Sequence, residues 1–223
     1  MNTENNTIQS ENQVRPVLIS RLTGGFISVI FHPVFLPVYV TAFCLYLHPT
    51  LFIGFSEKNK MNTLFIIILN MTLFPVVSVL LLKGLGFIES FFLKTQKDRI
   101  IPYIGTGIFF FWTYTVFKQQ TAYPLLFTSY LLGVFFASSA ALIANIYFKI
   151  SMHAIGMGTW LGFFLMIMHS DSMLMTWPLF FLIILCGLVC SARLLLKSHQ
   201  PLDMYAGLLL GVLAEAVAYL IIC

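Results

Sequence analysis

Charged side chains are scarce in this sequence. Its 223 residues include twelve Lys and Arg and eight Asp and Glu, which together make up 9% of the chain. A soluble domain normally carries about 25% charged residues, so this scarcity excludes an ordinary soluble domain and indicates an integral membrane protein. The formal net charge of +4 is small, and we expect no nucleic-acid partner.

The cysteines lack the neighbours that a metal site requires. Cys186 and Cys190 share a helical face within an apolar run, but no His or carboxylate accompanies them as zinc ligands would require. Cys44 and Cys223 also lie in apolar runs. We expect inert, buried thiols, and neither a metal nor another cofactor.

The N-terminal residues lack the basic start and the small-residue cleavage site of a signal peptide. Residues 1–25 are polar and rich in Asn, Gln and Ser, which predicts a flexible tail. No internal repeat and no linker divides the rest, so residues 26–223 are expected to form a single transmembrane domain.

Long apolar runs are abundant. A spanning helix needs about 20 apolar residues. Seven segments are candidates: 26–47, 63–83, 103–118, 124–147, 152–169, 176–197 and 203–222. We therefore predict an all-α polytopic transmembrane helix bundle of about six or seven spans. The third candidate is the shortest and leaves open a re-entrant or tilted hairpin with the fourth.

Local sequence adds detail to this bundle. Pro33 and Pro37 predict a kink in the first span. An apolar face followed by Lys and Arg predicts an interfacial helix near 86–98. Gly207 and Gly211 form a small-xxx-small pair that favours close helix packing.

Polar residues with catalytic potential are concentrated in three segments, 84–102, 148–152 and 193–203. Successive segments are separated by two predicted crossings, so all three should open onto one face of the membrane. The positive-inside rule would make this face cytoplasmic. Without the candidate phosphate-binding residues Lys94, Arg99, Lys149 and Arg193, five basic residues on this side stand against three on the other, which leaves the face open.

The last of these segments has spacing suited to chemistry. His199 and Asp203 are four residues apart, so on one helical face the carboxylate can reach the imidazole and fix its tautomer. Arg193, about two helical turns upstream, carries a guanidinium suited to phosphate or carboxylate. An oriented histidine beside an anion-binding group can attack phosphorus.

The second segment adds a hydroxyl, a cation and an imidazole at the start of a span. Ser151 and backbone N–H groups there, with Lys149, form a potential anion site. His153 is placed to protonate a leaving oxygen.

These motifs resemble those of the type 2 phosphatidic acid phosphatase superfamily, membrane lipid phosphate phosphatases related to vanadium haloperoxidases. Arg193, His199 and Asp203 match the spacing of its third motif in full, although Ala192 precedes the arginine and the serine is displaced to Ser191. The second motif keeps only its serine and histidine. The first, in residues 94–102, has the expected residue types at a different spacing.

The resemblance implies a role for each matching residue. His199 would be the nucleophile that forms a phosphohistidine, Asp203 would orient it, and His153 would act as general acid and then base. The phosphate oxygens would be held by Arg193, Arg99 and Ser151. The lysine of the first motif could be Lys94, Lys97 or Lys149, and Lys94 is slightly preferred over Lys149. The resemblance implies no metal.

We therefore expect a multi-pass enzyme, placed in the plasma (inner) membrane, that hydrolyses a lipid phosphate monoester or pyrophosphate. Phosphatidate, phosphatidylglycerophosphate, a polyprenyl phosphate or pyrophosphate and a lipid A type phosphate are all candidate substrates. A lipid phosphotransferase with the same site is one alternative. A carrier that binds an anion without chemistry is another. His32, near the kink, and Glu215, in mid-span, are assigned no catalytic role.

Overall fold

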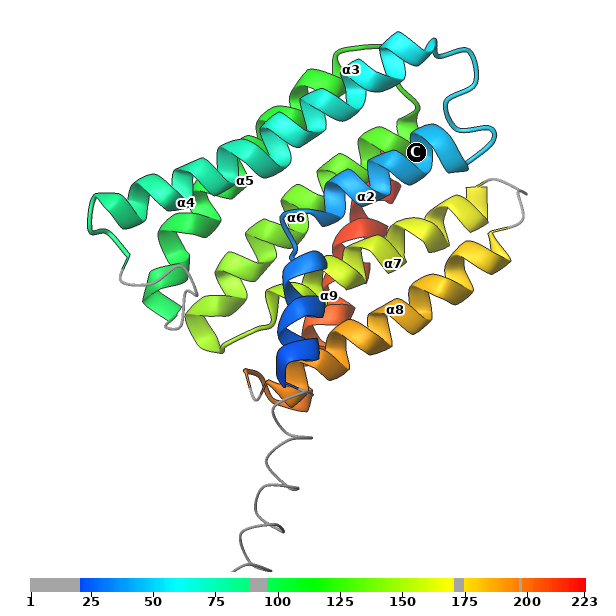
Figure 1. Ribbon diagram of the computed structural model, residues 1–223. Helices are drawn as coiled ribbons and strands as arrows, with labels where there is room; N and C mark the ends of the chain where they lie inside the picture. Colours follow the sequence, from blue (N-terminus) through cyan, green and yellow to red (C-terminus); the bar gives the residue numbers. More distant parts are fainter. Residues whose placement is uncertain (1–20, 89–95, 171–174, 197) are drawn as a thin grey trace, which may run out of the picture.

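The computed structural model describes residues 21–88, 96–170, 175–196 and 198–223 (Figure 1). Within these ranges the regular structure is helical: α2 (Leu36–Ala42), η1 (Phe43–Leu47), α3 (Glu57–Ile67), η2 (Ile68–Leu73), α4 (Phe74–Gly84), α5 (Gln96–Lys118), α6 (Leu125–Tyr147), α7 (Met152–Ser170), α8 (Thr176–Leu195) and α9 (Pro201–Ile222). A short helix, Arg21–Ile30, precedes α2. The protein is an all-α polytopic helix bundle, as predicted.

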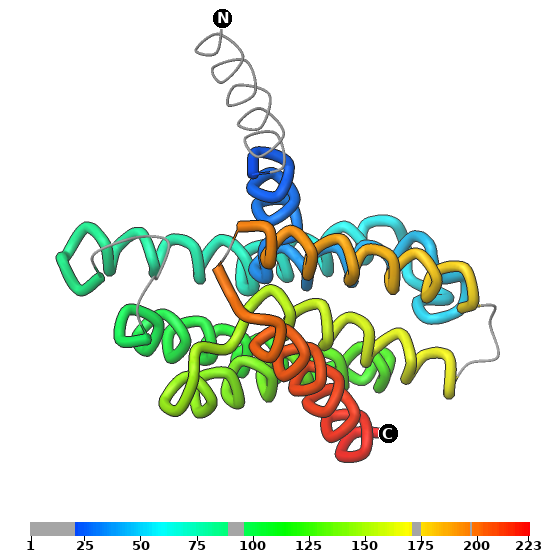
Figure 2. Tube along the Cα trace, turned by 90° about the horizontal axis from the view of Figure 1, so that it is seen from below, coloured from blue at the N-terminus to red at the C-terminus, as the bar shows by residue number. Residues whose placement is uncertain are grey.

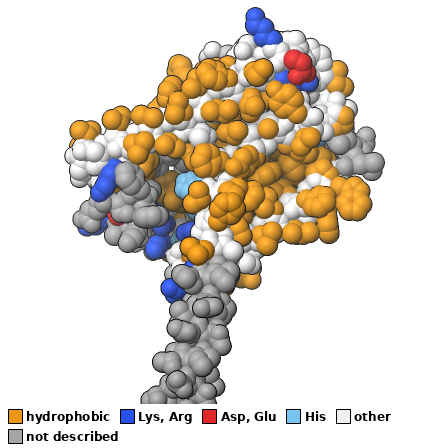
Figure 3. Space-filling view, viewed as in Figure 1, with side chains coloured by type: hydrophobic (Ala, Val, Ile, Leu, Met, Phe, Trp, Pro, Cys, Tyr) orange, Lys and Arg blue, Asp and Glu red, His pale blue; other side chains and the backbone are white. Residues whose placement is uncertain are grey.

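Six helices of the described chain are long and apolar enough to cross a membrane: Glu57–Gly84, Gln96–Lys118, Leu125–Tyr147, Met152–Ser170, Thr176–Leu195 and Pro201–Ile222. The first of them joins α3, η2 and α4 into one continuous helix. Hydrophobic side chains dominate the face in Figure 3, with Lys and Arg toward its ends, as a bilayer environment requires. The chain is a multi-pass membrane protein.

The structure differs from the predicted spans at two places. The first candidate, 26–47, is not one helix, because the chain leaves the helix after Ile30 and starts again at Leu36. This break lies at the predicted kink. The third candidate is not a short hairpin, because α5 begins at Gln96 and is 23 residues long.

Two further predictions fall partly on undescribed residues. Residues 1–20 of the expected tail lie outside the described ranges, whereas residues 21–25 already belong to a helix. The expected interfacial helix near 86–98 covers residues 89–95, which also lie outside them. Residues 86–88 are not helical, and 96–98 form the first turn of α5.

The helices form a layered bundle. Figure 2 shows α4 and α8 in one layer, with α5, α6, α7 and α9 on one side of it. The most extensive contacts join α9 to α7 and α6, and α5 to α6. The C-terminal ends of α4, α6 and α8 and the N-terminal ends of α5, α7 and α9 lie toward the same end of the bundle (Figure 1).

Small residues bring α7 and α9 together. A Cβ atom on Gly158 would collide with the carbonyl of Leu208, and one on Gly211 would collide with the carbonyl of Ile155. A Cβ atom on Gly207 would lie 2.8 Å from the Cβ of Ala154. Close backbone approach through small residues is a common way to pack helices in membranes. The predicted role of the pair Gly207 and Gly211 is therefore confirmed.

Candidate functional site

The three polar segments meet at one end of the bundle. This agrees with the sequence, in which two predicted membrane crossings separate each segment from the next. The side-chain amide of Asn145, near the end of α6, donates to the carbonyl of Gln96 at 2.8 Å. The Nη1 of Arg99, in the first turn of α5, donates to the carbonyl of Ile150 at 3.1 Å. These bonds join the start of α5 to the connection between α6 and α7.

His199 lies in the tight connection between α8 and α9. The hydroxyl of Ser198 donates to the carbonyl of Arg193 at 2.9 Å, which satisfies a carbonyl left free in the last turn of α8. Pro201 then starts α9, at a position where its missing N–H costs nothing. Arg193 and His199 are thereby held on one short stretch of chain.

Asp203 lies in the first turn of α9 and serves two neighbours. Its Oδ2 accepts a hydrogen bond from the backbone N–H of Gln200 at 3.0 Å, completing a capping box. The same oxygen lies 3.5 Å from the Nδ1 of His199. A carboxylate at this position favours a proton on Nδ1 of the imidazole and leaves the Nε2 lone pair available.

His199 is a neutral imidazole at ordinary pH. Its side chain is only 3% exposed. Burial, followed by the nearby guanidinium groups of Arg193 and Arg99, lowers the pKa of His199 to about 4, although Asp203 acts in the opposite direction. A neutral histidine with a free Nε2 is the form that a nucleophile requires.

Arg193 is half-buried in the last turn of α8. Its Nε has no hydrogen-bond partner, and no carboxylate of the described residues forms an ion pair with it. Buried charges are normally paired. Arg193 and Arg99 also lie close enough to interact electrostatically, and both act on His199. Two cations facing one another create a positive potential that favours an anion between them.

His153 is buried in the first turn of α7. Its Nε2 donates to the carbonyl of Ser28 at 2.9 Å, since a carbonyl can only accept. In the neutral ring Nδ1 is then the acceptor, so Nδ1 is the atom that would gain or lose a proton. The Ser28 carbonyl thus fixes the tautomer of His153 from outside the three polar segments.

Ser151 and Lys149 lie on the connection between α6 and α7. Ser151 is fully buried, and its Oγ accepts from the backbone N–H of Ala154 at 3.4 Å, so it caps α7. Lys149 is exposed on the connection before α7, although it lies near enough to His199 to act on it electrostatically. Lys94 lies outside the described residues.

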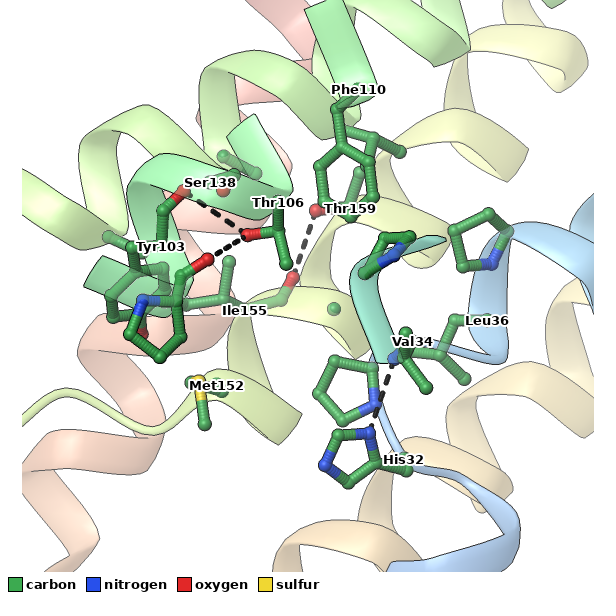
Figure 4. A pocket seen from close by; sticks show the side chains of 18 of the residues that line it. His32, Val34, Leu36, Tyr103, Thr106, Phe110, Ser138, Met152, Ile155 and Thr159 are labelled. Atoms are coloured by element: carbon green, nitrogen blue, oxygen red, sulfur yellow. Dashed lines mark hydrogen bonds between the residues drawn. The ribbon is translucent and has the colours of Figure 1, made fainter. Parts of the chain in front are cut away.

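A cavity of about 350 Å³ adjoins these residues. Its walls come from the turn before α2, the start of α2, and α4, α5, α6 and α7, and α8 contributes Arg193. Figure 4 shows part of this lining. On α5 its lining runs from Arg99 to Phe110, a distance of roughly 16 Å along the helix. Arg99, Arg193 and His32 are the basic side chains that line it, and most of the other walls are apolar.

His32 is the residue that sequence reasoning missed. It lies in the break after Ile30, and its ring centroid is 5.3 Å from that of His153 in an edge-to-face arrangement. The sequence did contain a signal, because His32 adjoins Pro33 in an apolar run, where a polar group is costly without a purpose.

Comparisons of the chain with protein families, with curated proteins and with solved structures give no match.

Proposed function

We propose that this protein is an integral-membrane phosphatase that hydrolyses a lipid phosphate monoester or pyrophosphate through a phosphohistidine. The observation that carries the proposal is the apolar cavity with Arg99 and Arg193 at one end, next to the pair formed by His199 and Asp203. An amphiphile with an anionic head and an apolar tail matches this distribution of charge.

In the first step, Nε2 of His199 attacks the phosphorus atom. The N–P bond forms as the P–O bond to the lipid breaks, and the leaving oxygen takes a proton. The guanidinium groups of Arg193 and Arg99 stabilise the phosphoryl oxygens, because fixed cations complement the charge of the transition state. The carboxylate of Asp203 stabilises the positive charge that forms on the imidazole.

In the second step, water attacks the phosphorus and the N–P bond breaks, which returns His199 to its neutral form. We propose that the anionic phosphate head favours the doubly protonated form of His153. Its Nδ1 then gives a proton to the leaving oxygen in the first step and takes one back from the attacking water in the second. The bond from its Nε2 to the Ser28 carbonyl keeps the ring in one orientation during both steps.

The substrate is proposed to be one of the lipids with a phosphate or pyrophosphate head, and the protein to act in the plasma (inner) membrane. A panel of phosphatidate, phosphatidylglycerophosphate, polyprenyl phosphate and pyrophosphate, and a lipid A type phosphate tests the substrate. Release of phosphate from one of them by the detergent-purified chain is the expected result.

The matched pair of variants for this assay is His199→Ala and His169→Ala. His169 is an exposed histidine at the other end of α7. We expect His199→Ala to abolish phosphate release and His169→Ala to preserve it. Equal activity of His199→Ala and the wild type would contradict the assignment. Phosphate transfer that requires an added acceptor lipid would instead identify a phosphotransferase.

A further inference from the structure

His32 faces the cavity more openly than the two histidines of the motifs. His153 is 6% exposed and the side chain of His199 is 3% exposed, and neither lines the cavity. His32 is exposed and does line it, together with Arg99 and Arg193. Figure 3 shows a histidine side chain in a hollow surrounded by hydrophobic side chains, with Lys and Arg side chains toward the same end.

The turn that carries His32 is held in place from both sides. The hydroxyl of Tyr39 donates to the carbonyl of Ile30 at 3.0 Å, and the hydroxyl of Thr72, on η2, donates to the carbonyl of Val34 at 2.8 Å. The turn is therefore tied to α2 and to the helix that contains α4. A side chain on such a turn has a fixed direction, which lowers the entropic cost of binding a ligand.

The ring of His32 is also fixed. Its Nδ1 accepts from the backbone N–H of Val34 at 3.4 Å, which Figure 4 shows as a dashed line. The proton of the neutral ring is consequently on Nε2, which is left as a hydrogen-bond donor. In Figure 4, His32 and Leu36 lie across the cavity from Tyr103 and Thr106.

Charge at this end of the cavity favours an anion. Arg193 lies close enough to His32 to interact with it electrostatically, as it does with His153. Among the described residues that line the cavity, none carries a carboxylate, and the basic side chains are His32, Arg99 and Arg193. Hydrogen bonds from such donors to a phosphate oxygen are among the stronger ones in proteins.

We propose that His32 is a substrate-binding residue whose Nε2–H donates to an oxygen of the phosphate head in this cavity, beside Arg99 and Arg193. The proposal rests on the proposed function for the identity of the ligand. It adds to that function a third phosphate contact, supplied by the N-terminal turn and not by the three polar segments.

Two conservative variants separate the nitrogens of this ring. In His32→Asn the amide reaches only to the position of Nδ1, so it keeps the contact with Val34 and loses the donor at Nε2. In His32→Gln the amide reaches to the position of Nε2 and keeps a donor there. His32→Ala removes both.

The test is titration of inorganic phosphate into the full chain in detergent, for the wild type and the three variants. We expect His32→Asn and His32→Ala to weaken phosphate binding about ten- to hundredfold, because a hydrogen bond to a charged group is lost. His32→Gln should stay within about threefold of the wild type. Unchanged thermal unfolding of His32→Asn is the control for an intact turn.

The outcomes separate this proposal from the proposed function. Phosphate binding that is independent of His32, or absent in the wild type, overturns the role of His32 whether or not a lipid phosphate is hydrolysed. Equal losses for His32→Gln and His32→Ala also overturn it. Binding that requires His32, in a protein that hydrolyses none of the lipid phosphates, supports the contact and refutes the enzymatic function.

Discussion

Asp203→Asn removes one negative charge next to His199 while keeping the size of the side chain. When Nε2 bonds to phosphorus, the imidazole gains a positive charge, and the Oδ2 of Asp203 lies 3.5 Å from Nδ1. An amide oxygen can still accept from the backbone N–H of Gln200, so the first turn of α9 should stay capped. The substitution therefore tests the charge and not the cap.

The expected size of the effect follows from this distance. Two unit charges 3.5 Å apart interact by about 5 kcal/mol at an effective dielectric constant of 20, and by about 1 kcal/mol in bulk water. The side chain of Asp203 is 22% exposed, which places the site between these limits. We therefore expect Asp203→Asn to lower kcat by roughly tenfold to a thousandfold.

Phosphate release from the best lipid of the panel is the assay, with thermal unfolding in parallel. Asp203→Ala should lose the same activity and in addition about 1 kcal/mol of stability, because the cap is removed. Glu57→Gln, which removes an exposed carboxylate at the start of α3, is the control for net charge. A kcat of Asp203→Asn equal to that of the wild type would refute the stabilising role of the carboxylate.

Three further predictions concern pH, helix packing and the phosphate-binding residues. Burial and the nearby arginines lower the pKa of His199 to about 4, and the neutral form is the nucleophile, so the acidic limb of the pH–rate profile should lie near this pH, with activity lost as the pH falls through it. An acidic limb of the pH–rate profile centred at 6.5 or above would contradict this. A Cβ on Gly158 would collide with a carbonyl of α9, whereas one on Gly187 meets nothing within 4 Å. Gly158→Ala should therefore lower the free energy of unfolding in detergent by about 1–3 kcal/mol, and Gly187→Ala by less than about 1 kcal/mol. Arg193→Ala should lower kcat/KM at least about a hundredfold, and substitution of the exposed Lys149 by Ala should lower it less than about tenfold. A larger loss for Lys149→Ala than for Arg193→Ala would place the phosphate site nearer the lysine.

The sequence predicted the helical class, most of the spans and the end of the bundle at which the polar segments meet. These features follow from the length of the apolar runs and from the number of crossings between the polar segments, which depend little on how the helices pack. The start of α5 was missed because Gln96, Lys97, Asp98 and Arg99 are polar, and hydropathy alone cannot extend a span through such residues. The helix begins before the apolar run and includes these residues as its first turn.

The site was predicted less completely, because part of it depends on contacts between distant segments. The spacing of Arg193, His199 and Asp203 is local and could be recognised in the sequence. The bond between His153 and Ser28 joins residues 125 positions apart, and no periodicity predicts it. His32 joins the cavity through the break at Pro33, whose direction is set by packing against η2.

The proposed mechanism requires a covalent bond between His199 and phosphorus. The direct measurement is to mix the detergent-purified chain with a lipid carrying radiolabelled phosphate, to stop the reaction in alkali, where phosphohistidine is stable, and to locate the label by mass spectrometry. We expect label on the peptide that contains His199 and none in His199→Ala. Phosphate release by the wild type with no label on this peptide, or with equal release by His199→Ala, would contradict it.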